Sequence, residues 1–349
     1  MIRVLIAEDS PFIAAMMREA LREETEITVV GWAKNGQEAI ELRNSLEPDV
    51  ITMDLNMPVM SGLEAIKTIA STRPLPILVV SQMIESRDSE LAFEALRSGA
   101  VDIMGKPSGD RQKGFSEIKD ELISRIKVAA RIRPMHLIRK PPAKPPKVKP
   151  VGKMVLRQGL VVIGASTGGP PALTTILKGF PQDFPAPIAI VQHIAPGFVT
   201  GLSHWLERET PFSVKVAVKG ESLSAGNVYL APDNHHLEIA TDRKILLGSE
   251  PPIRGHRPSI DRLMESAAHV YGRDAIGVLL TGMGSDGAKG LKKIREAGGK
   301  TIVQDEATSL VFGMPREAIL LAAAEIVSPL ERIAEEIVQA TSAERGKIK

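Results

Sequence analysis

The sequence predicts an α/β fold with two domains, each built around a mainly parallel sheet. Three observations lead to this prediction. Apolar runs typical of buried strands alternate with amphipathic helical stretches on both sides of the chain's middle. The segment 139–150, RKPPAKPPKVKP, is too poor in apolar residues to join a core, so it predicts an extended spacer. A chain of 349 residues is long enough to bury a core on each side of that spacer.

The first domain is predicted at residues 1–125 and a linker at 126–158, with its proline- and lysine-rich part at 139–150. Five apolar runs are the expected strands of this domain, and amphipathic helical stretches alternate with them. The runs are VLIAE, ITVVGWA, DVITMDL, PILVVSQ and VDIMGK. This alternation predicts a parallel sheet covered by helices on both faces, because right-handed crossovers place helices above and below it.

The second domain is predicted at residues 159–349. Its expected buried parallel strands are LVVIGAS, PIAIVQH and AIGVLLTG, each followed by a glycine-rich turn and a helical pattern. Between them, SVKVAVKG, NVYLAPD and HLEIATD predict a shorter β segment that includes antiparallel pairs. We therefore expect a doubly wound, mainly parallel α/β domain with a small antiparallel segment.

Composition excludes several classes of protein. The chain has no cysteine, which excludes disulfides, thiolate metal sites and a cysteine nucleophile. Its net charge of +2 does not demand nucleic acid as a partner. No apolar stretch approaches the length of a membrane span, and the start MIRVLIAEDS predicts a strand and not a secretory signal. We expect a cytoplasmic protein that neither binds nucleic acid nor inserts into a membrane.

Charged residues follow three expected strands of the first domain. Glu8 and Asp9 end the first strand, Asp54 ends the third and Lys106 follows the fifth. The carboxyl ends of parallel strands form the ligand-binding edge of an open α/β sheet, so these side chains are expected in one crevice. Three crowded carboxylates repel one another unless a cation is present, and a hard divalent ion such as Mg²⁺ takes oxygen ligands.

The first domain resembles a response-regulator receiver domain, the flavodoxin-like (βα)5 module that a histidine kinase phosphorylates on aspartate. The motifs that carry the resemblance are Glu8-Asp9-Ser10, MDLNMPVMSG, PILVVS and VDIMGKP. One position departs from the usual pattern, because Ile103 stands three residues before Lys106, where receivers often have an aromatic residue.

The receiver resemblance also implies roles for individual residues. Asp54 would be the phosphoacceptor, and Ser81 and Lys106 would contact the phosphoryl oxygens. Four residues would surround Mg²⁺, one of them through its backbone carbonyl: Glu8, Asp9, Asp54 and, by its carbonyl, Asn56.

A serine lies in a glycine-rich turn after the first strand of the second domain. Gly164-Ala165-Ser166-Thr167-Gly168 matches the G-x-S-x-G nucleophile elbow, in which a sharp turn exposes the serine oxygen. The spacing matches neither the dinucleotide motif nor the P-loop. Small residues also gather in tight turns for steric reasons, so this match alone leaves open whether Ser166 is a nucleophile or a turn residue.

A nucleophilic serine needs a base and a group that orients the base. Among the seven histidines, His193 stands at the carboxyl end of an expected buried strand, PIAIVQH. Asp286 and Asp305 each lie near the end of an apolar strand, and position alone does not separate them. The glycines of TGMGSDG favour Asp286, because they allow backbone N–H groups to approach an oxyanion.

Residues 159–340 resemble the catalytic domain of the chemotaxis protein-glutamate methylesterases. The motifs are IGASTGGP, VQHIAPGF, GHRPSIDRL, LLTGMGSDGAKGL and TIVQDEATSLVFGMP. The resemblance implies Ser166 as nucleophile, His193 as base and Asp286 as the orienting acid, with the Met283 amide in the oxyanion hole. Asp305 would then be structural.

Together the two resemblances imply a phosphorylation-regulated hydrolase that demethylates γ-glutamyl methyl esters of chemoreceptors and deamidates particular glutamines, giving adaptation in chemotaxis. The implied partners are methyl-accepting chemoreceptors and a chemotaxis histidine kinase. Mg²⁺ would serve the receiver, and the esterase would need no cofactor. The main alternative, a receiver driving a nucleic-acid-binding output, predicts a helix-turn-helix and a basic face. A second alternative is a receiver that regulates a nucleotide-binding domain. The sequence contains no complete phosphate-binding motif to support it.

Overall fold

A computed structural model of the protein describes residues 1–81, 86–106, 114–132 and 159–342. The chain divides into two compact units, residues 1–140 and 141–349. The predicted spacer at 139–150 lies outside the described residues. The last described helix of the first unit runs to Ala129, beyond the predicted domain end at residue 125.

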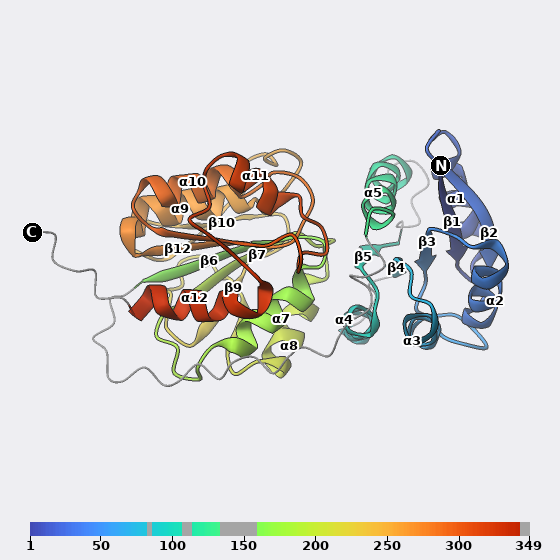
Figure 1. The fold of residues 1–349 in the computed structure, drawn as a ribbon, viewed down its shortest axis with the longest axis horizontal. Helices are drawn as coiled ribbons and strands as arrows, with labels where there is room; N and C mark the ends of the chain where they lie inside the picture. Colours follow the sequence, from blue (N-terminus) through green and yellow to red (C-terminus); the bar gives the residue numbers. More distant parts are fainter. Residues whose placement is uncertain (82–85, 107–113, 133–158, 343–349) are drawn as a thin grey trace, which may run out of the picture. The chain divides into compact units, whose positions relative to one another are not determined.

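The first unit is a parallel sheet with helices on both faces (Figure 1). Its elements are β1 (Ile2–Ala7), α1 (Pro11–Arg22), β2 (Ile27–Ala33), α2 (Gly36–Leu46), β3 (Val50–Met53), α3 (Gly62–Thr72), β4 (Ile77–Ser81), α4 (Ser86–Ser98), β5 (Asp102–Gly105) and α5 (Gly114–Ala129). The strand order is β2-β1-β3-β4-β5, and every neighbouring pair is parallel. Helices α1 and α5 pack together, as do α2, α3 and α4. This is the flavodoxin-like fold that the sequence predicts.

The second unit contains a seven-stranded sheet and a separate β-hairpin. Its elements are β6 (Leu160–Ala165), α7 (Gly169–Gly179), β7 (Ile188–Gln192), α8 (Val199–Glu209), β8 (Ser213–Val216), β9 (Asn227–Leu230), β10 (His236–Ile239), β11 (Ile245–Gly248), α9 (Ile260–Tyr271), the short 3₁₀ helix η1 (Gly272–Asp274), β12 (Ala275–Leu279), α10 (Ala288–Glu296), β13 (Lys300–Gln304), α11 (Met314–Leu320), β14 (Ile326–Ser328) and α12 (Leu330–Ser342). The order in the large sheet is β14-β13-β12-β6-β7-β9-β8. All of its pairs are parallel.

The predicted small antiparallel segment is present as a hairpin. The other two strands of the short β segment, β8 and β9, pair in parallel and extend the large sheet beyond β7. Only β10 and β11 form an antiparallel pair among the described strands. The reason lies in burial, because Val228, Tyr229 and Leu230 of β9 are all buried, as in a strand covered on both faces.

Helices cover both faces of the large sheet. Helices α7, α8 and α12 lie on one face and α9, α10 and α11 on the other (Figure 1). The hairpin β10–β11 packs against α9. Among the described helices, none has the length and apolar composition that a membrane crossing requires.

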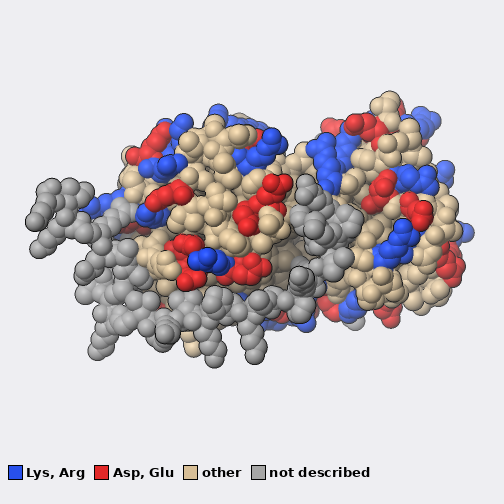
Figure 2. Space-filling view, in the orientation of Figure 1, with Lys and Arg blue, Asp and Glu red and all other residues tan. Residues whose placement is uncertain are grey.

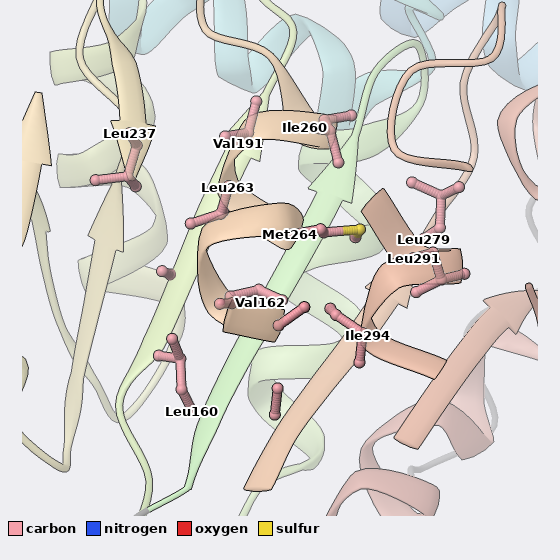
Figure 3. Packing of buried hydrophobic residues seen from close by; sticks show 14 of the residues in the cluster. Leu160, Val162, Val191, Leu237, Ile260, Leu263, Met264, Leu279, Leu291 and Ile294 are labelled. Carbon is pink, nitrogen blue, oxygen red and sulfur yellow. The ribbon is translucent and has the colours of Figure 1, made fainter. Parts of the chain in front are cut away.

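The core of the second unit fixes α9 against the sheet (Figure 3). Leu263 and Met264 of α9 are fully buried, together with Val162 of β6. Gly277 of β12 permits the close approach of α10, because a Cβ there would lie 2.7 Å from the side chain of Ile294. Helix α9 is therefore held firmly by close packing, which matters because its N-terminus reaches the candidate site.

Candidate active site and receiver pocket

The candidate active site lies at the carboxyl ends of three adjacent strands. Strand β6 pairs with β7 on one side and with β12 on the other, which makes this the point where the strand order reverses. Ser166 follows β6, His193 follows β7, and Asp286 lies in the loop between β12 and α10. Ligands of open α/β sheets bind in the crevice at such a position.

Ser166 lies in a sharp turn between β6 and α7. Its N–H donates to the Thr281 carbonyl (3.1 Å), and its own carbonyl accepts from the Gly169 N–H (2.7 Å). Gly168 has φ +77°, a left-handed conformation that glycine adopts without strain. The side chain of Ser166 is half-buried, and a Cβ on Gly282 would lie 2.6 Å from its Cβ. The turn therefore holds the serine against the loop that follows β12.

Gln192 ties the serine turn to the histidine. Its Nε2 donates to the Ser166 carbonyl (2.9 Å) and to the His193 carbonyl (2.8 Å). Ala165 and Gln192 are register partners in the parallel pair, and the His193 N–H donates to the Ala165 carbonyl (2.9 Å). Gly169 leaves room for the amide, since a Cβ there would lie 1.9 Å from Gln192 Oε1. Serine and histidine are thus fixed at adjacent strand ends through their backbones.

His193 and Asp286 form a buried hydrogen-bonded pair. The distance from His193 Nε2 to Asp286 Oδ2 is 3.0 Å, and the two side chains are 8% and 1% exposed. The other ring nitrogen, Nδ1, is buried and has no hydrogen-bond partner among the described residues. A ring nitrogen without a partner, on an imidazole whose opposite nitrogen binds a carboxylate, is available to accept a proton.

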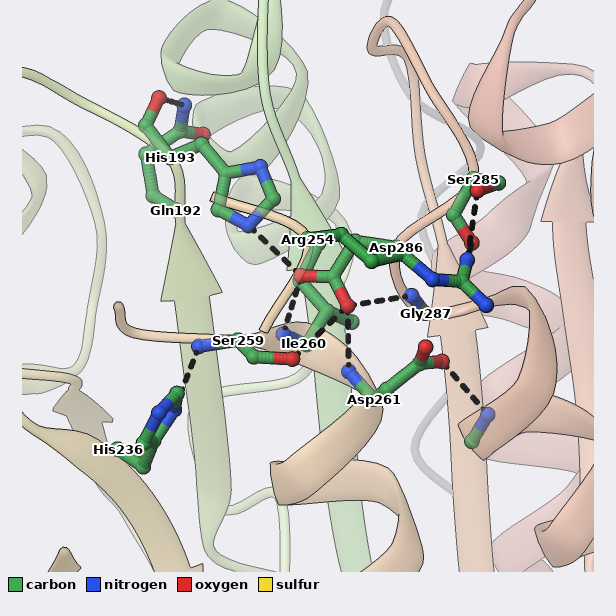
Figure 4. A network of polar contacts seen from close by, with 11 residues as sticks. Gln192, His193, His236, Arg254, Ser259, Ile260, Asp261, Ser285, Asp286 and Gly287 are labelled. Atoms are coloured by element: carbon green, nitrogen blue, oxygen red, sulfur yellow. Dashed lines mark hydrogen bonds and ion pairs between the residues drawn. The ribbon is translucent and has the colours of Figure 1, made fainter. Parts of the chain in front are cut away.

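Asp286 is bound by the N-terminus of α9 (Figure 4). Its Oδ1 accepts from the Ser259 hydroxyl (2.9 Å) and from the N–H groups of Asp261 (3.0 Å) and Gly287 (3.1 Å). Its Oδ2 accepts from the Ile260 N–H (2.7 Å) as well as from His193. Burial by itself would raise the pKa of Asp286, but His193 and these backbone donors lower it to about 2. The carboxylate therefore stays ionised at neutral pH.

The depressed pKa of Asp286 predicts a contribution to acid stability. A carboxyl whose pKa falls from 3.8 to about 2 on folding stabilises the fold above pH 4, and that contribution disappears as the pH falls towards 2. We expect the free energy of unfolding to decrease by about 2 kcal/mol more in the native protein than in Asp286→Asn between pH 5 and pH 2. Urea unfolding of both proteins across this range measures the difference; parallel pH curves would contradict it.

Asp305, the other carboxylate considered from sequence, has different partners. Its Oδ1 accepts from the backbone N–H (3.0 Å) and the hydroxyl (2.6 Å) of Thr308, and so closes a turn after β13. Met283, expected to supply an oxyanion N–H, follows Gly282 in the loop that packs against Ser166. The geometry thus groups Ser166, His193, Asp286 and Met283 and assigns Asp305 a local structural contact.

The sequence analysis did not single out His256, which lies beside His193 in the structure. The rings of His193 and His256 stack with centroids 4.0 Å apart and planes inclined by 6°. Arg254 and Gly255 have positive φ values and make a tight turn closed by reciprocal backbone bonds between Ile253 and His256. Gly255, which adopts a positive φ, was the available signal for the turn. Gln192 and Ser259 were also missed, because their roles depend on contacts between distant segments.

The acidic cluster that the sequence predicts lies at the carboxyl edge of the first sheet. Lys106 Nζ lies 2.8 Å from Glu8 Oε2 and 2.8 Å from Asp54 Oδ2. Oxygen atoms of Glu8, Asp9 and Asp54 lie within 4.8 Å of one another. Oxygen donors grouped in this way are the ligands that Mg²⁺ prefers, so these residues fit the ion.

Burial and neighbouring charges have opposite effects on the pKa values of the acidic residues and the lysine in this cluster. Burial raises the pKa values of Glu8 and Asp54 despite the contacts of both groups with Lys106. Burial would lower the pKa of Lys106, but its hydrogen bonds to Asp54 and Glu8 raise it. The site therefore holds carboxylates whose ionisation a bound cation would favour.

Two of the remaining predicted receiver residues contact Lys106 or Asp54, and the third lies in the core. Ser81 is buried at the end of β4, and its carbonyl accepts from the Lys106 N–H (2.9 Å). The Asn56 N–H donates to Asp54 Oδ1 (3.3 Å). Ile103 is buried in β5, as part of the core.

Two family models match the chain. The model for CheB methylesterase matches residues 161–337, and the model for response regulator receiver domains matches residues 4–118. A Pyrococcus horikoshii protein named protein-glutamate methylesterase/protein-glutamine glutaminase is 39% identical over 355 residues, which cover 99% of this chain and 95% of that protein. A Myxococcus xanthus protein of the same name, numbered 4, is 40% identical over 351 residues, covering 99% and 98%.

A solved structure agrees with the second unit. The crystal structure of the Thermotoga maritima CheB methylesterase catalytic domain is 39% identical, covers 53% of this chain and 99% of that chain, and has a TM-score of 0.52. The fold and the matches define a response regulator whose second domain is a hydrolase. The chain belongs to the CheB methylesterase family.

Proposed function

We propose that the second domain hydrolyses γ-glutamyl methyl esters of chemoreceptors through a triad of Ser166, His193 and Asp286. The observation that carries this proposal is the buried His193–Asp286 pair at the strand end next to Ser166. The names of the relatives supply the reaction, because both are called protein-glutamate methylesterase and glutaminase. On the face drawn in Figure 2, acidic and basic side chains are interspersed, unlike the basic face that the nucleic-acid-binding alternative predicts.

In the proposed mechanism, His193 Nδ1 takes the hydroxyl proton as Ser166 Oγ attacks the ester carbonyl. The oxyanion that forms accepts a hydrogen bond from the Met283 N–H. Nδ1 then gives its proton to the departing methanol, and a water molecule, activated in the same way, hydrolyses the acyl-serine to glutamate. Asp286 remains a carboxylate throughout and stabilises the imidazolium.

Deamidation follows the same path. A glutamine side chain would acylate Ser166 with ammonia as the leaving group, and hydrolysis of the acyl-enzyme again gives glutamate. No step in either reaction requires a group beyond the four residues and water.

The test of this function is methanol release from methyl-esterified chemoreceptors. The native protein is expected to release methanol, and Ser166→Ala is expected to abolish the release. Ser224→Ala is a matched control, because Ser224 is exposed and precedes β9. If Ser166→Ala released methanol at the native rate, the proposed nucleophile would be wrong.

We further propose that a histidine kinase phosphorylates the receiver at Asp54 and thereby regulates the esterase. Glu8, Asp9, Asp54 and the Asn56 carbonyl would hold Mg²⁺, while Ser81 and Lys106 would contact the phosphoryl oxygens. The grouping of acidic oxygens around Lys106 supports this assignment. When bound, the ion supplies positive charge that offsets both the carboxylates and the incoming phosphoryl group.

Mg²⁺ is expected to stabilise the receiver against heat. A ligand at one hundred times its dissociation constant stabilises the folded state by about 2.7 kcal/mol, which raises the melting temperature of a domain of this size by about 10 °C. Calorimetry of the full chain with Mg²⁺ or with a chelator measures this shift. Asp9→Asn should reduce it sharply, whereas Asp120→Asn, on the exposed side of α5, should not. If Mg²⁺ raised the melting temperature equally in Asp9→Asn and Asp120→Asn, the ion would bind elsewhere.

A further inference from the structure

A second histidine is buried beside the candidate active site and is not used in the proposed mechanism. His236 begins β10 and is fully buried. Its Nδ1 lies 3.1 Å from the Ser259 backbone nitrogen, and its Nε2 lies 3.3 Å from the Pro251 carbonyl oxygen. Both partners belong to the segment that precedes and caps α9.

The two contacts define which ring nitrogen of His236 carries the proton. Ser259 N–H can only donate, so His236 Nδ1 must be an unprotonated acceptor. The Pro251 carbonyl can only accept, so Nε2 must carry the proton. Both contacts are satisfied together only by the neutral Nε2–H tautomer, in which one ring connects two points of the same segment.

Ser259 connects this histidine to the candidate active site (Figure 4). Its N–H donates to His236, while its hydroxyl donates to Asp286 Oδ1 (2.9 Å). Ser259 is fully buried and stands at the N-cap of α9, but its side chain makes no capping bond to its own helix. Asp286 in turn binds His193. A continuous series of hydrogen bonds therefore runs from His236 through Ser259 and Asp286 to His193.

We propose that His236 is a positioning residue for the esterase reaction, which acts through Ser259 on Asp286. This inference rests on the proposed triad. By fixing the Ser259 N–H, the ring sets where the Ser259 hydroxyl and the first N–H groups of α9 meet the carboxylate. Strand β10, which carries His236, is itself attached to α9, because the Ile239 N–H donates to Ser266 Oγ of α9 (3.0 Å).

Two substitutions separate positioning from simple space-filling. In His236→Asn the amide oxygen replaces Nδ1 and keeps the acceptor for Ser259, while the contact with Pro251 is lost. In His236→Gln the amide nitrogen replaces Nε2 and keeps the donor to Pro251, while the acceptor for Ser259 is lost. Both variants remove the same ring from the same buried position, so a space-filling role predicts similar defects.

The expected result is a difference in kcat between the two variants. For methanol release from esterified receptors, we expect His236→Asn to retain most of the native kcat and His236→Gln to lose up to about tenfold, the size of one neutral hydrogen bond. KM should change little in either, because His236 contacts no substrate. His204→Gln, the same substitution at an exposed position of α8, should match the native protein.

A measurement without substrate tests the same contact. The low-field proton resonance of the His193–Asp286 hydrogen bond should persist in His236→Asn and shift or broaden in His236→Gln. If either variant fails to fold, Ser259→Ala replaces it: removing the hydroxyl should lower kcat and shift that resonance, with KM again little changed.

Several outcomes would overturn the inference. Equal losses of kcat in His236→Asn and His236→Gln, or a resonance that moves equally in both, would mean that the ring only fills space. A native kcat in Ser259→Ala would remove the connection to Asp286. Failure of the native protein to release methanol would instead reject the proposed function, and the resonance would still report on the contact.

Discussion

Replacing Ser166 by alanine is expected to lower the rate of methyl ester hydrolysis by about ten-thousandfold or more. The hydroxyl is the proposed nucleophile, and the turn that presents it is held by backbone contacts that alanine retains, namely those with Thr281, Gly169 and Gln192. The variant should therefore fold normally and lose only the chemistry. Rates of methanol release under saturating receptor measure the loss directly.

His193→Ala is expected to cost about as much as Ser166→Ala, and the double variant should be little worse than either. Residues that act as one catalytic unit lose their joint contribution once, so their effects do not add. Additive losses of activation free energy in the double variant would argue against a shared mechanism. His269→Ala, on α9 away from the strand ends, serves as the control for loss of an imidazole.

Asp54→Asn is expected to abolish labelling by a radioactive small phosphodonor such as acetyl phosphate. The substitution keeps the size of the side chain but removes the carboxylate oxygen that is proposed to attack phosphorus. Labelling of the native protein should require Mg²⁺ and should be lost in hydroxylamine, as expected of an acyl phosphate. Asp120→Asn should label normally.

The same experiment tests regulation. Phosphodonor and Mg²⁺ together should change the rate of methanol release by the native protein but leave that of Asp54→Asn unaltered. Labelling that survives in Asp54→Asn would move the phosphorylation site to another residue. Labelling without any change in hydrolysis would separate the receiver chemistry from control of the esterase.

The fold was predictable because short apolar runs alternate with amphipathic helical stretches, which is typical of buried parallel strands in an α/β fold. Glu8, Asp54 and Lys106 could be grouped from sequence for the same reason, since each follows such a run and parallel strands end at one edge. Lys106 does contact Glu8 and Asp54 in the structure. For Asp286 against Asp305, the glycines of the first loop favoured Asp286, and the structure shows that this carboxylate contacts His193.

The residues that the sequence did not reveal act through packing between distant segments. Ser259 precedes Asp286 by a whole helix and strand, and their contact exists only because α9 packs over β6 and β12. His256 stacks on His193 from a turn that lies far from His193 in the sequence. The sequence also left open how β8 and β9 pair, because short strands carry little information about their direction.

The contact between Asp286 and α9 bears on how this enzyme can be engineered. Catalytic carboxylates commonly reduce the stability of their protein, so that replacing them makes it more resistant to heat. Asp286, the proposed orienting acid, also caps the N-terminus of the core helix α9, and its two oxygens satisfy the N–H groups of Ile260 and Asp261 that would otherwise be buried without acceptors. Selection for thermal resistance and selection for turnover should therefore both retain this aspartate, and heat-stable variants will have to arise from changes elsewhere in the domain.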